Sequence, residues 1–201
     1  MRIDHVLRTR YPALRAGGHA SWAHVSGWAQ LSGHRQNVSC IVPALEHGSV
    51  LAELLPTLSD VLTECGYPWE VIVVDAGSRD ETDRVLREWC EVDGFRALML
   101  HGDVGRESTL TIGLAEARGD AAVLLDPASA YPLTLLTRMV ILWESGAELV
   151  CAMRDPRRGE ECVLRSWDPS APDDAQGLPA LNVDTCKLML IDRRLVDLLL
   201  R

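Results

Sequence analysis

The chain has 201 residues, 47% of them hydrophobic, and a formal net charge of -9. A chain of this length most economically forms one domain, and its acidic balance disfavours nucleic acid as a partner. Its apolar runs fall well short of the roughly 18 residues that a membrane-spanning helix needs, so we expect a soluble protein.

The six cysteines show no CxxC spacing, and several of them lie within apolar runs. Cysteines of this kind are typical of small buried hydrophobic residues in a reducing compartment. They argue against a disulfide framework and against a cysteine metal site. We therefore expect a cytoplasmic location.

The first 36 residues differ in composition from the rest of the chain. They contain five arginines and a single acidic residue, Asp4, together with many Gly, His, Ser and Trp residues. An irregular N-terminal extension accounts for this composition, and an organellar transit peptide is the alternative. We therefore place the domain over residues 37–201.

From residue 38 onward, short β-branched runs alternate with helical patterns. Strands are predicted at residues 38–42, 71–75, 96–101, 121–126, 148–153 and 187–191, with Pro43 expected to stop the first of them. Helices are predicted around residues 50–62, 82–91, 108–118 and 135–143 and from residue 192, and a loop at 166–179. This alternation predicts an α/β fold with a doubly wound, mostly parallel sheet and helices on both faces.

One stretch, Trp69–Asp83, joins a buried strand to a polar turn. Val71–Val74 is a continuous β-branched run without polar alternation, which is typical of a parallel strand covered on both faces. The strand ends at Asp75, and Gly77 and Ser78 follow in the turn. Because ligands of open α/β sheets bind at the carboxyl ends of strands, Asp75 is a candidate binding residue. Capping of the next helix by Asp75 and Ser78 is the structural alternative.

Four stretches occur in an order and spacing that point to one family. They are Val38–Ala44, Trp69–Asp80, Gly113–Asp126 and Asp192–Asp197. Together they resemble the family 2 glycosyltransferases, and especially the branch that moves a sugar from a nucleotide sugar to a polyprenyl or dolichyl phosphate. The resemblance begins at residue 38 and implies the GT-A arrangement, a nucleotide-binding α/β sheet that agrees with the strand pattern.

The resemblance implies nucleotide contacts at the ends of the first two strands. Pro43 and Ala44 match the end of the family's first strand, whose backbone borders the base. Asp75 matches an acid that contacts the base or ribose, and Gly77 and Ser78 complete the expected site in the same turn. A carboxylate there can accept a hydrogen bond from an imide N–H or a ribose hydroxyl. A proline that ends a strand and an aspartate that caps a turn remain the alternative.

A basic turn is the next part of the resemblance. Gly105, Arg106 and Gly113 match the place where the family has a glycine-rich turn that opens a helix under the nucleotide. A helix N-terminus with an adjacent arginine is a sound anion site, so we expect Arg106 to meet the diphosphate. A solvated surface arginine beside Glu107 is the alternative.

Asp126 matches the first acid of the family's metal-binding DXD motif, whose second acid falls on Ala128. The resemblance implies that Asp126 is a catalytic residue and a metal ligand. A single carboxylate holds Mg²⁺ or Mn²⁺ poorly, so the ion would be bound mostly through the nucleotide diphosphate. Otherwise the positive charge must come from Arg106, or from Arg154 and Arg157, which match basic residues that bind donor or acceptor phosphates in the family.

The chain departs from the family pattern at further positions. Glu46 and His47 stand where the family usually has Asn-Glu, and Ala76 replaces the second of two paired aspartates. The family's late arginine falls on Met189, and Lys187 is close enough to substitute in a shifted register.

Two function classes fit these features, and a homo-oligomer is compatible with both. The first is an inverting transferase that moves a sugar from a nucleotide-diphosphate sugar to an acceptor, with a lipid phosphate at a membrane surface as one acceptor. A phosphate acceptor needs no general base, whereas a hydroxyl acceptor would need Glu46, His47 or Asp126. The second is a non-catalytic nucleotide-sugar binding or scaffolding module, for which Ala128 is the discriminating feature. A Rossmann-type oxidoreductase is disfavoured because no GxGxxG follows the first strand.

Overall fold

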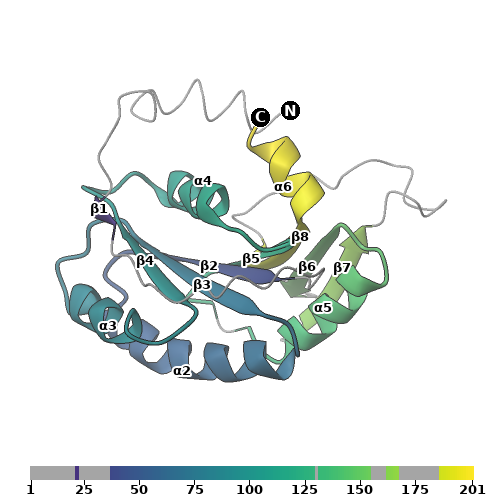
Figure 1. The fold of residues 1–201 in the computed structure, drawn as a ribbon, viewed down its shortest axis with the longest axis horizontal. Helices are drawn as coiled ribbons and strands as arrows, with labels where there is room; N and C mark the ends of the chain where they lie inside the picture. Colours follow the sequence, from purple (N-terminus) through teal and green to yellow (C-terminus); the bar gives the residue numbers. More distant parts are fainter. Residues whose placement is uncertain (1–20, 23–36, 130, 155–161, 168–185) are drawn as a thin grey trace.

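A computed structural model describes residues 21–22, 37–129, 131–154, 162–167 and 186–201 (Figure 1). Within these ranges the chain forms one eight-stranded sheet of order β1-β4-β3-β2-β5-β8-β6-β7. The strands are β1 (Ser21–Trp22), β2 (Val38–Ala44), β3 (Trp69–Asp75), β4 (Phe95–Met99), β5 (Ala121–Leu125), β6 (Leu149–Arg154), β7 (Cys162–Trp167) and β8 (Leu188–Asp192). The helices are α2 (Gly48–Glu64), α3 (Thr82–Trp89), α4 (Arg106–Glu116), α5 (Leu135–Glu144) and α6 (Arg193–Leu199).

The four strands at the centre of the sheet, β4-β3-β2-β5, are parallel, whereas the strands at both margins are antiparallel. The parallel strands are those that alternate with helices along the chain, because a parallel connection needs a crossover. The predicted α/β fold is confirmed. The antiparallel direction of β8 has a consequence for the site, since the start of β8 meets the end of β5.

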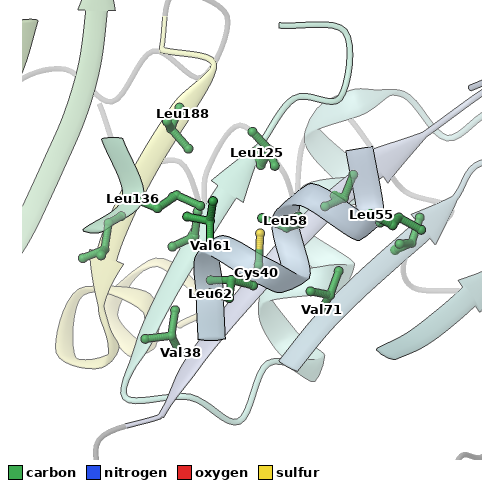
Figure 2. Close-up of a cluster of buried hydrophobic side chains, with 14 of the residues drawn as sticks. Val38, Cys40, Leu55, Leu58, Val61, Leu62, Val71, Leu125, Leu136 and Leu188 are labelled. Carbon is green, nitrogen blue, oxygen red and sulfur yellow. The ribbon is translucent and has the colours of Figure 1, made fainter. Parts of the chain in front are cut away.

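Helices cover both faces of the sheet, with α2, α3 and α5 on one side and α4 and α6 on the other (Figure 1). The continuous apolar run of β3 follows from this arrangement. Val71 and Val73 pack in the cluster that contains Leu58 of α2 (Figure 2), whereas Ile72 and Val74 pack in the cluster on the α4 side. Each side chain of the strand therefore enters one of two cores, as expected for a strand covered on both faces.

Beyond shifts of one or two residues at several element ends, three differences from the prediction concern Pro43, helix α4 and an additional strand. Pro43 lies inside β2 and does not stop it, because pairing with β5 ends at Ile41 and leaves that side of the strand as an edge, where proline is tolerated. Helix α4 begins at Arg106, two residues earlier than predicted. Strand β7 was not predicted, and its last two residues occupy the start of the loop expected at 166–179. The rest of that loop lies outside the described residues.

The N-terminal extension predicted for residues 1–36 lies outside the described residues, except for β1. Ser21 and Trp22 pair antiparallel with Met99 and Leu98 of β4. Among the described helices, none combines the length and the apolar character needed to cross a membrane.

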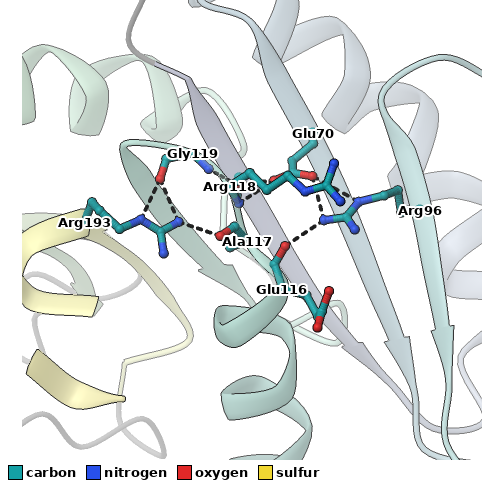
Figure 3. Close-up of polar contacts among 8 residues, drawn as sticks. Glu70, Arg96, Glu116, Ala117, Arg118, Gly119 and Arg193 are labelled. Atoms are coloured by element: carbon teal, nitrogen blue, oxygen red, sulfur yellow. Dashed lines mark hydrogen bonds and ion pairs between the residues drawn. The ribbon is translucent and has the colours of Figure 1, made fainter. Parts of the chain in front are cut away.

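A buried ion pair joins the amino-terminal ends of the central strands (Figure 3). Glu70 of β3 is 2% exposed and accepts hydrogen bonds from Ser39 Oγ at 2.6 Å and from the backbone N–H of Arg118 at 2.8 Å. Arg96 of β4 donates to Glu70 through Nε at 3.1 Å and Nη2 at 2.8 Å. From α6, Arg193 donates to backbone carbonyls at the end of α4. These bonds tie β2, β3 and β4 together at the edge opposite to the predicted site.

Candidate functional site

Two predicted carboxylates meet at the carboxyl edge of the parallel strands. Asp75 is the last residue of β3 and lies in register with Ala44 of β2, and Asp126 directly follows β5 on the other side of β2. Strands that are two positions apart lie about 10 Å from one another. The expected placement of both residues at one edge is confirmed, and one extended ligand could reach both.

The Asp75 side chain is only 1% exposed and shapes its own turn. Its carboxylate accepts hydrogen bonds from the backbone N–H of Ser78, at 3.2 Å, and from the Ser78 hydroxyl. Burial raises the pKa of the Asp75 carboxyl above its ordinary value, and the hydrogen bonds from Ser78 partly oppose this rise. Asp75 therefore holds its own turn, but Asp75 and Ser78 do not cap the next helix, because α3 begins at Thr82 with Glu81 at its N-cap. A contact with a nucleotide stays a prediction.

The turn after β3 is held against the turn after β2. The backbone N–H of Glu46 donates to Ser78 Oγ at 2.8 Å, and Glu46 Oε1 accepts from the backbone N–H of Arg79 at 2.8 Å. The backbone N–H of Gly48 donates to Asp80 Oδ2 at 2.9 Å. Glu46 has a φ of 56°, which is unusual for a residue with a side chain, and these bonds hold it there. The two turns, here called the double turn (residues 45–48 and 76–80), are thus joined by hydrogen bonds at the edge.

The remaining residues predicted to contact a nucleotide fall into two groups. Pro43, Ala44 and Gly77 lie at the edge, and Gly77 has a φ of 88° with the backbone of Gly102 so close that a Cβ would lie 3.0 Å from its nitrogen. The turn therefore requires glycine there. Gly113 instead lies within α4, where a side chain would collide with Ile41 of β2, so its place in the structure is to let α4 approach the sheet closely.

Asp126 lies between two cations that come from different elements. Arg106, the first residue of α4, places Nη1 2.7 Å from Asp126 Oδ2. Lys187, just before β8, places Nζ 3.3 Å from the same oxygen. The exposed fractions of the three side chains are 26% for Arg106, 14% for Asp126 and 36% for Lys187. Three partly exposed charges with a formal sum of +1 therefore lie at the end of β5.

The residues around Asp126 do not fit a hard divalent cation. Asp126 Oδ2 already faces both cations, and Oδ1 accepts from the backbone N–H of Ala128 at 3.0 Å. Ala128 itself is exposed and offers no side-chain oxygen. No cluster of three or more potential metal ligands occurs among the described residues, whereas Mg²⁺ and Mn²⁺ require several oxygens. In this arrangement Asp126 is an acceptor for two organic cations.

The other predicted catalytic residues are less completely described. Arg154 ends β6, and only its backbone is described. Arg157 lies outside the described residues. Among the candidate bases, His47 accepts a hydrogen bond from the backbone N–H of Leu45 through Nδ1, at 3.1 Å.

Sequence reasoning missed Lys187 as a partner of Asp126. No local motif marks this role, because it follows from the direction of the last strand. Because β8 is antiparallel to β5, the residue before β8 necessarily lies beside the residue after β5. Lys187 is also the only lysine in the sequence, which makes its place at this edge easy to test.

Comparison with known proteins decides the family. The model of Glycosyl transferase family 2 matches residues 39–188. The chain belongs to glycosyltransferase family 2. The resemblance inferred from the four sequence stretches is thereby confirmed at the level of the family, which is a family of enzymes.

Two curated relatives in family 2 show how distant the individual similarities are. The uncharacterised glycosyltransferase YkcC of Bacillus subtilis is 27% identical over 162 residues, which cover 79% of this chain and 50% of the relative. An undecaprenyl-phosphate 4-deoxy-4-formamido-L-arabinose transferase of Pseudomonas fluorescens is 28% identical over 170 residues, which cover 81% of this chain and 49% of the relative. The chain thus spans about half the length of these relatives.

A solved structure confirms the fold. A mannosyltransferase from Pyrobaculum calidifontis, in complex with GDP-Man and Mn²⁺, superposes with a TM-score of 0.59 at 19% identity. The match covers 98% of this chain and 55% of the mannosyltransferase. The α/β arrangement described above is therefore the GT-A arrangement that the sequence resemblance implied.

Proposed function

We propose that this family 2 domain transfers a sugar from a nucleotide-diphosphate sugar to an acceptor at the carboxyl edge of its parallel strands. The observation that carries the proposal is the pair of cations, Arg106 and Lys187, held beside Asp126 at that edge. The hydrogen-bonded double turn that Asp75 holds lies at the same edge. A positive site beside a preformed turn suits a ligand with a diphosphate and a polar base.

The charges at the edge suit the bond changes of an inverting transfer. The acceptor oxygen forms a bond to the anomeric carbon while the bond from that carbon to the diphosphate oxygen breaks. The electron pair of the broken bond stays on the nucleoside diphosphate, whose negative charge rises. Positive groups beside the departing diphosphate stabilise that charge in the transition state. In this proposal Arg106 and Lys187 supply the stabilisation, while Arg154 and Arg157 are further candidates from the sequence.

A polyprenyl phosphate is the acceptor we propose first. The name of the Pseudomonas fluorescens relative specifies an undecaprenyl-phosphate acceptor. A phosphate acceptor is ionised at neutral pH, so the transfer needs no general base. A hydroxyl acceptor would require one, and the candidates from the sequence are Glu46, His47 and Asp126. Glu46 and His47 already make hydrogen bonds in the turns after β2 and β3, and Asp126 is paired with two cations.

The Mn²⁺ in the Pyrobaculum mannosyltransferase complex raises the question of a metal in this chain. The ligand set at Asp126 does not fit such an ion, as described above. A metal that accompanies the nucleotide would therefore have to be held mainly by the oxygens of the diphosphate. We assign no step of the reaction to it.

A non-catalytic nucleotide-sugar binding module is the second candidate function. The observation that favours it is the exposed Ala128 beside a carboxylate that is already neutralised by two cations. The two candidates share a binding site and differ in turnover. Binding of a nucleotide sugar without consumption of the donor, in the presence of acceptors, would favour the second.

Calorimetric titration with a panel of nucleoside diphosphates and nucleotide sugars tests the proposal. We expect the protein to select one nucleobase, and we expect donor consumption when undecaprenyl phosphate is added with the matching nucleotide sugar. Replacing Asp75 by Ala should weaken binding by about 1–3 kcal/mol, because the turn loses its buried acceptor. If the protein binds none of the nucleotides in the panel, both candidate functions are refuted.

A further inference from the structure

The three charges at the end of β5 form a fixed arrangement that spans separate parts of the chain. Arg106 belongs to the first turn of α4, Asp126 directly follows β5, and Lys187 directly precedes β8. The backbone N–H of Asp126 donates to the carbonyl of Lys187 at 2.9 Å, which fixes the two backbones relative to one another. The Asp126 side chain is only 14% exposed, so it is more buried than the two cations that it binds. Surface ion pairs without such support contribute little.

The charge balance of this arrangement favours an anion. One carboxylate neutralises one of the two cations, so a formal charge of +1 remains. Within the described ranges, Arg106 donates one hydrogen bond, through Nη1, and its Nε is buried without a partner. A guanidinium has five N–H donors and an ammonium has three, so both groups keep donors that an anion can use. A diphosphate offers several acceptor oxygens and negative charge in one ligand.

The same charge balance disfavours the binding of a divalent metal ion at Asp126. An ion placed at Asp126 would lie within a few ångströms of two positive groups, and it would compete with them for a single carboxylate oxygen. Removal of either cation would leave Asp126 closer to the state of an ordinary metal ligand. The chain's own residues therefore occupy the position where a metal would act.

We infer that Arg106 and Lys187 replace the divalent metal in this chain, so that the diphosphate of the nucleotide binds without Mg²⁺ or Mn²⁺. Asp126 is then a positioning residue that holds the two cations, and Arg106 and Lys187 contact the diphosphate. This inference rests on the proposed function, because it assumes that a nucleotide binds at the edge. It goes further by excluding a metal requirement and by giving Asp126 the role of holding the two cations.

Titration of matched variants in EDTA and in Mn²⁺ tests the inference. The probes are UDP, GDP and inorganic pyrophosphate, and the variants are Arg106→Gln, Lys187→Gln and Lys187→Arg. Arg87→Gln is the control, because it removes the same charge from an exposed surface pair in α3. Thermal unfolding of each variant verifies that it is folded. The conservative substitution Lys187→Arg keeps the positive charge, so this variant should keep most of the affinity. A role of Lys187 in folding alone would not predict that the affinity follows the charge at this position.

We expect the unmodified protein to bind its preferred nucleoside diphosphate equally well in EDTA and in Mn²⁺. Arg106→Gln and Lys187→Gln should each raise the Kd about 10-fold or more in EDTA, and Arg87→Gln should leave it unchanged. Binding that requires Mn²⁺ would overturn the inference and leave the proposed function intact. So would binding in EDTA that neither substitution weakens. Absence of nucleotide binding in both conditions would instead refute the proposed function, and the inference with it.

Discussion

Asp126 and Lys187 are joined twice. The backbone N–H of Asp126 donates to the carbonyl of Lys187 at 2.9 Å, and Nζ of Lys187 lies 3.3 Å from Asp126 Oδ2. The first bond continues the antiparallel pairing of β5 with β8, in which Leu125 pairs with Leu188. The register of two strands therefore sets the position of the ion pair, and a slip of one residue would turn the lysine to the other face of the sheet.

Asp126→Asn distinguishes between two roles of Asp126, that of a metal ligand and that of a residue that holds two cations. A metal site would lose its main protein ligand, so metal-dependent binding would collapse. If Asp126 instead holds the two cations, the substitution loosens Arg106 and Lys187, and the affinity should fall by a similar factor in EDTA and in Mn²⁺. Calorimetry with the preferred nucleoside diphosphate measures the difference. A loss of affinity that is confined to Mn²⁺ would contradict the positioning role of Asp126.

Ala128→Asp should create a metal response that the parent lacks. The new carboxylate lies two residues after Asp126 at an exposed position, where it adds oxygen ligands that a divalent ion prefers. We expect the variant to bind nucleotide more tightly in Mn²⁺ than in EDTA, while the parent shows no such difference. An equal response of parent and variant to Mn²⁺ would count against the interpretation of Ala128. Ala128→Asn is the control for size without charge.

Glu70→Ala should destabilise the fold strongly, although Glu70 lies at the edge opposite to the site. The substitution leaves Arg96, whose side chain is 13% exposed, without its carboxylate partner. Breaking a buried pair in this way costs about 3–5 kcal/mol of the free energy of unfolding. Glu88→Ala breaks an exposed pair with Arg84 and should cost well under about 1 kcal/mol. Urea denaturation of both variants checks the contrast, and similar midpoints would show that the Glu70 network contributes little.

Asp75→Asn should change how stability depends on pH. Burial raises the pKa of Asp75, so the folded state binds this proton more tightly than the unfolded state. The free energy of unfolding of the parent therefore carries a component that falls as pH rises from the ordinary aspartate value of 3.8 through the raised value. Asparagine removes that component, so the variant should gain stability relative to the parent as pH rises through this window. Urea denaturation at a series of pH values measures it.

Asp80→Asn is the control, because its effect on the pH dependence of stability should have the opposite sign to that of Asp75→Asn. Hydrogen bonding by Thr82, together with bonds from neighbouring backbone N–H groups, lowers the pKa of Asp80. Its contribution to stability is present above the ordinary value of 3.8 and is lost as pH falls through the lowered value. The Asp80 variant should therefore lose stability relative to the parent as pH rises. A pH profile of the same sign for both variants would contradict the assignment.

Much of the fold follows from local patterns in the sequence. The β-branched run that ends at Asp75 predicted a strand covered on both faces, and the alternation with helices predicted the parallel centre of the sheet. Pro43 misled the prediction because its effect depends on where the neighbouring strand stops pairing, which the sequence does not display. Strand β7 was missed because its run, Cys162–Trp167, mixes polar and apolar residues next to a Pro-rich segment.

The candidate site could be predicted only in part. The rule for strand ends located Asp75, whereas Arg106 and Asp126 were located by the resemblance to the family. Lys187 depends on the antiparallel direction of β8, and Glu46 contributes through its backbone conformation, so neither role is visible in a motif. Long-range pairing thus supplies the part of the site that local sequence lacks.

The most direct measurement of the central claim uses Lys187, the only lysine in the sequence. Reductive methylation with ¹³C-formaldehyde labels this lysine and any free terminal amine and keeps their charge, and Lys187→Arg assigns the lysine signal by removing it. Titration of the labelled protein in EDTA with its preferred nucleoside diphosphate should shift that signal in proportion to the bound fraction measured by calorimetry. A lysine signal that stays unchanged while the nucleotide saturates the protein would contradict direct contact between Lys187 and the diphosphate.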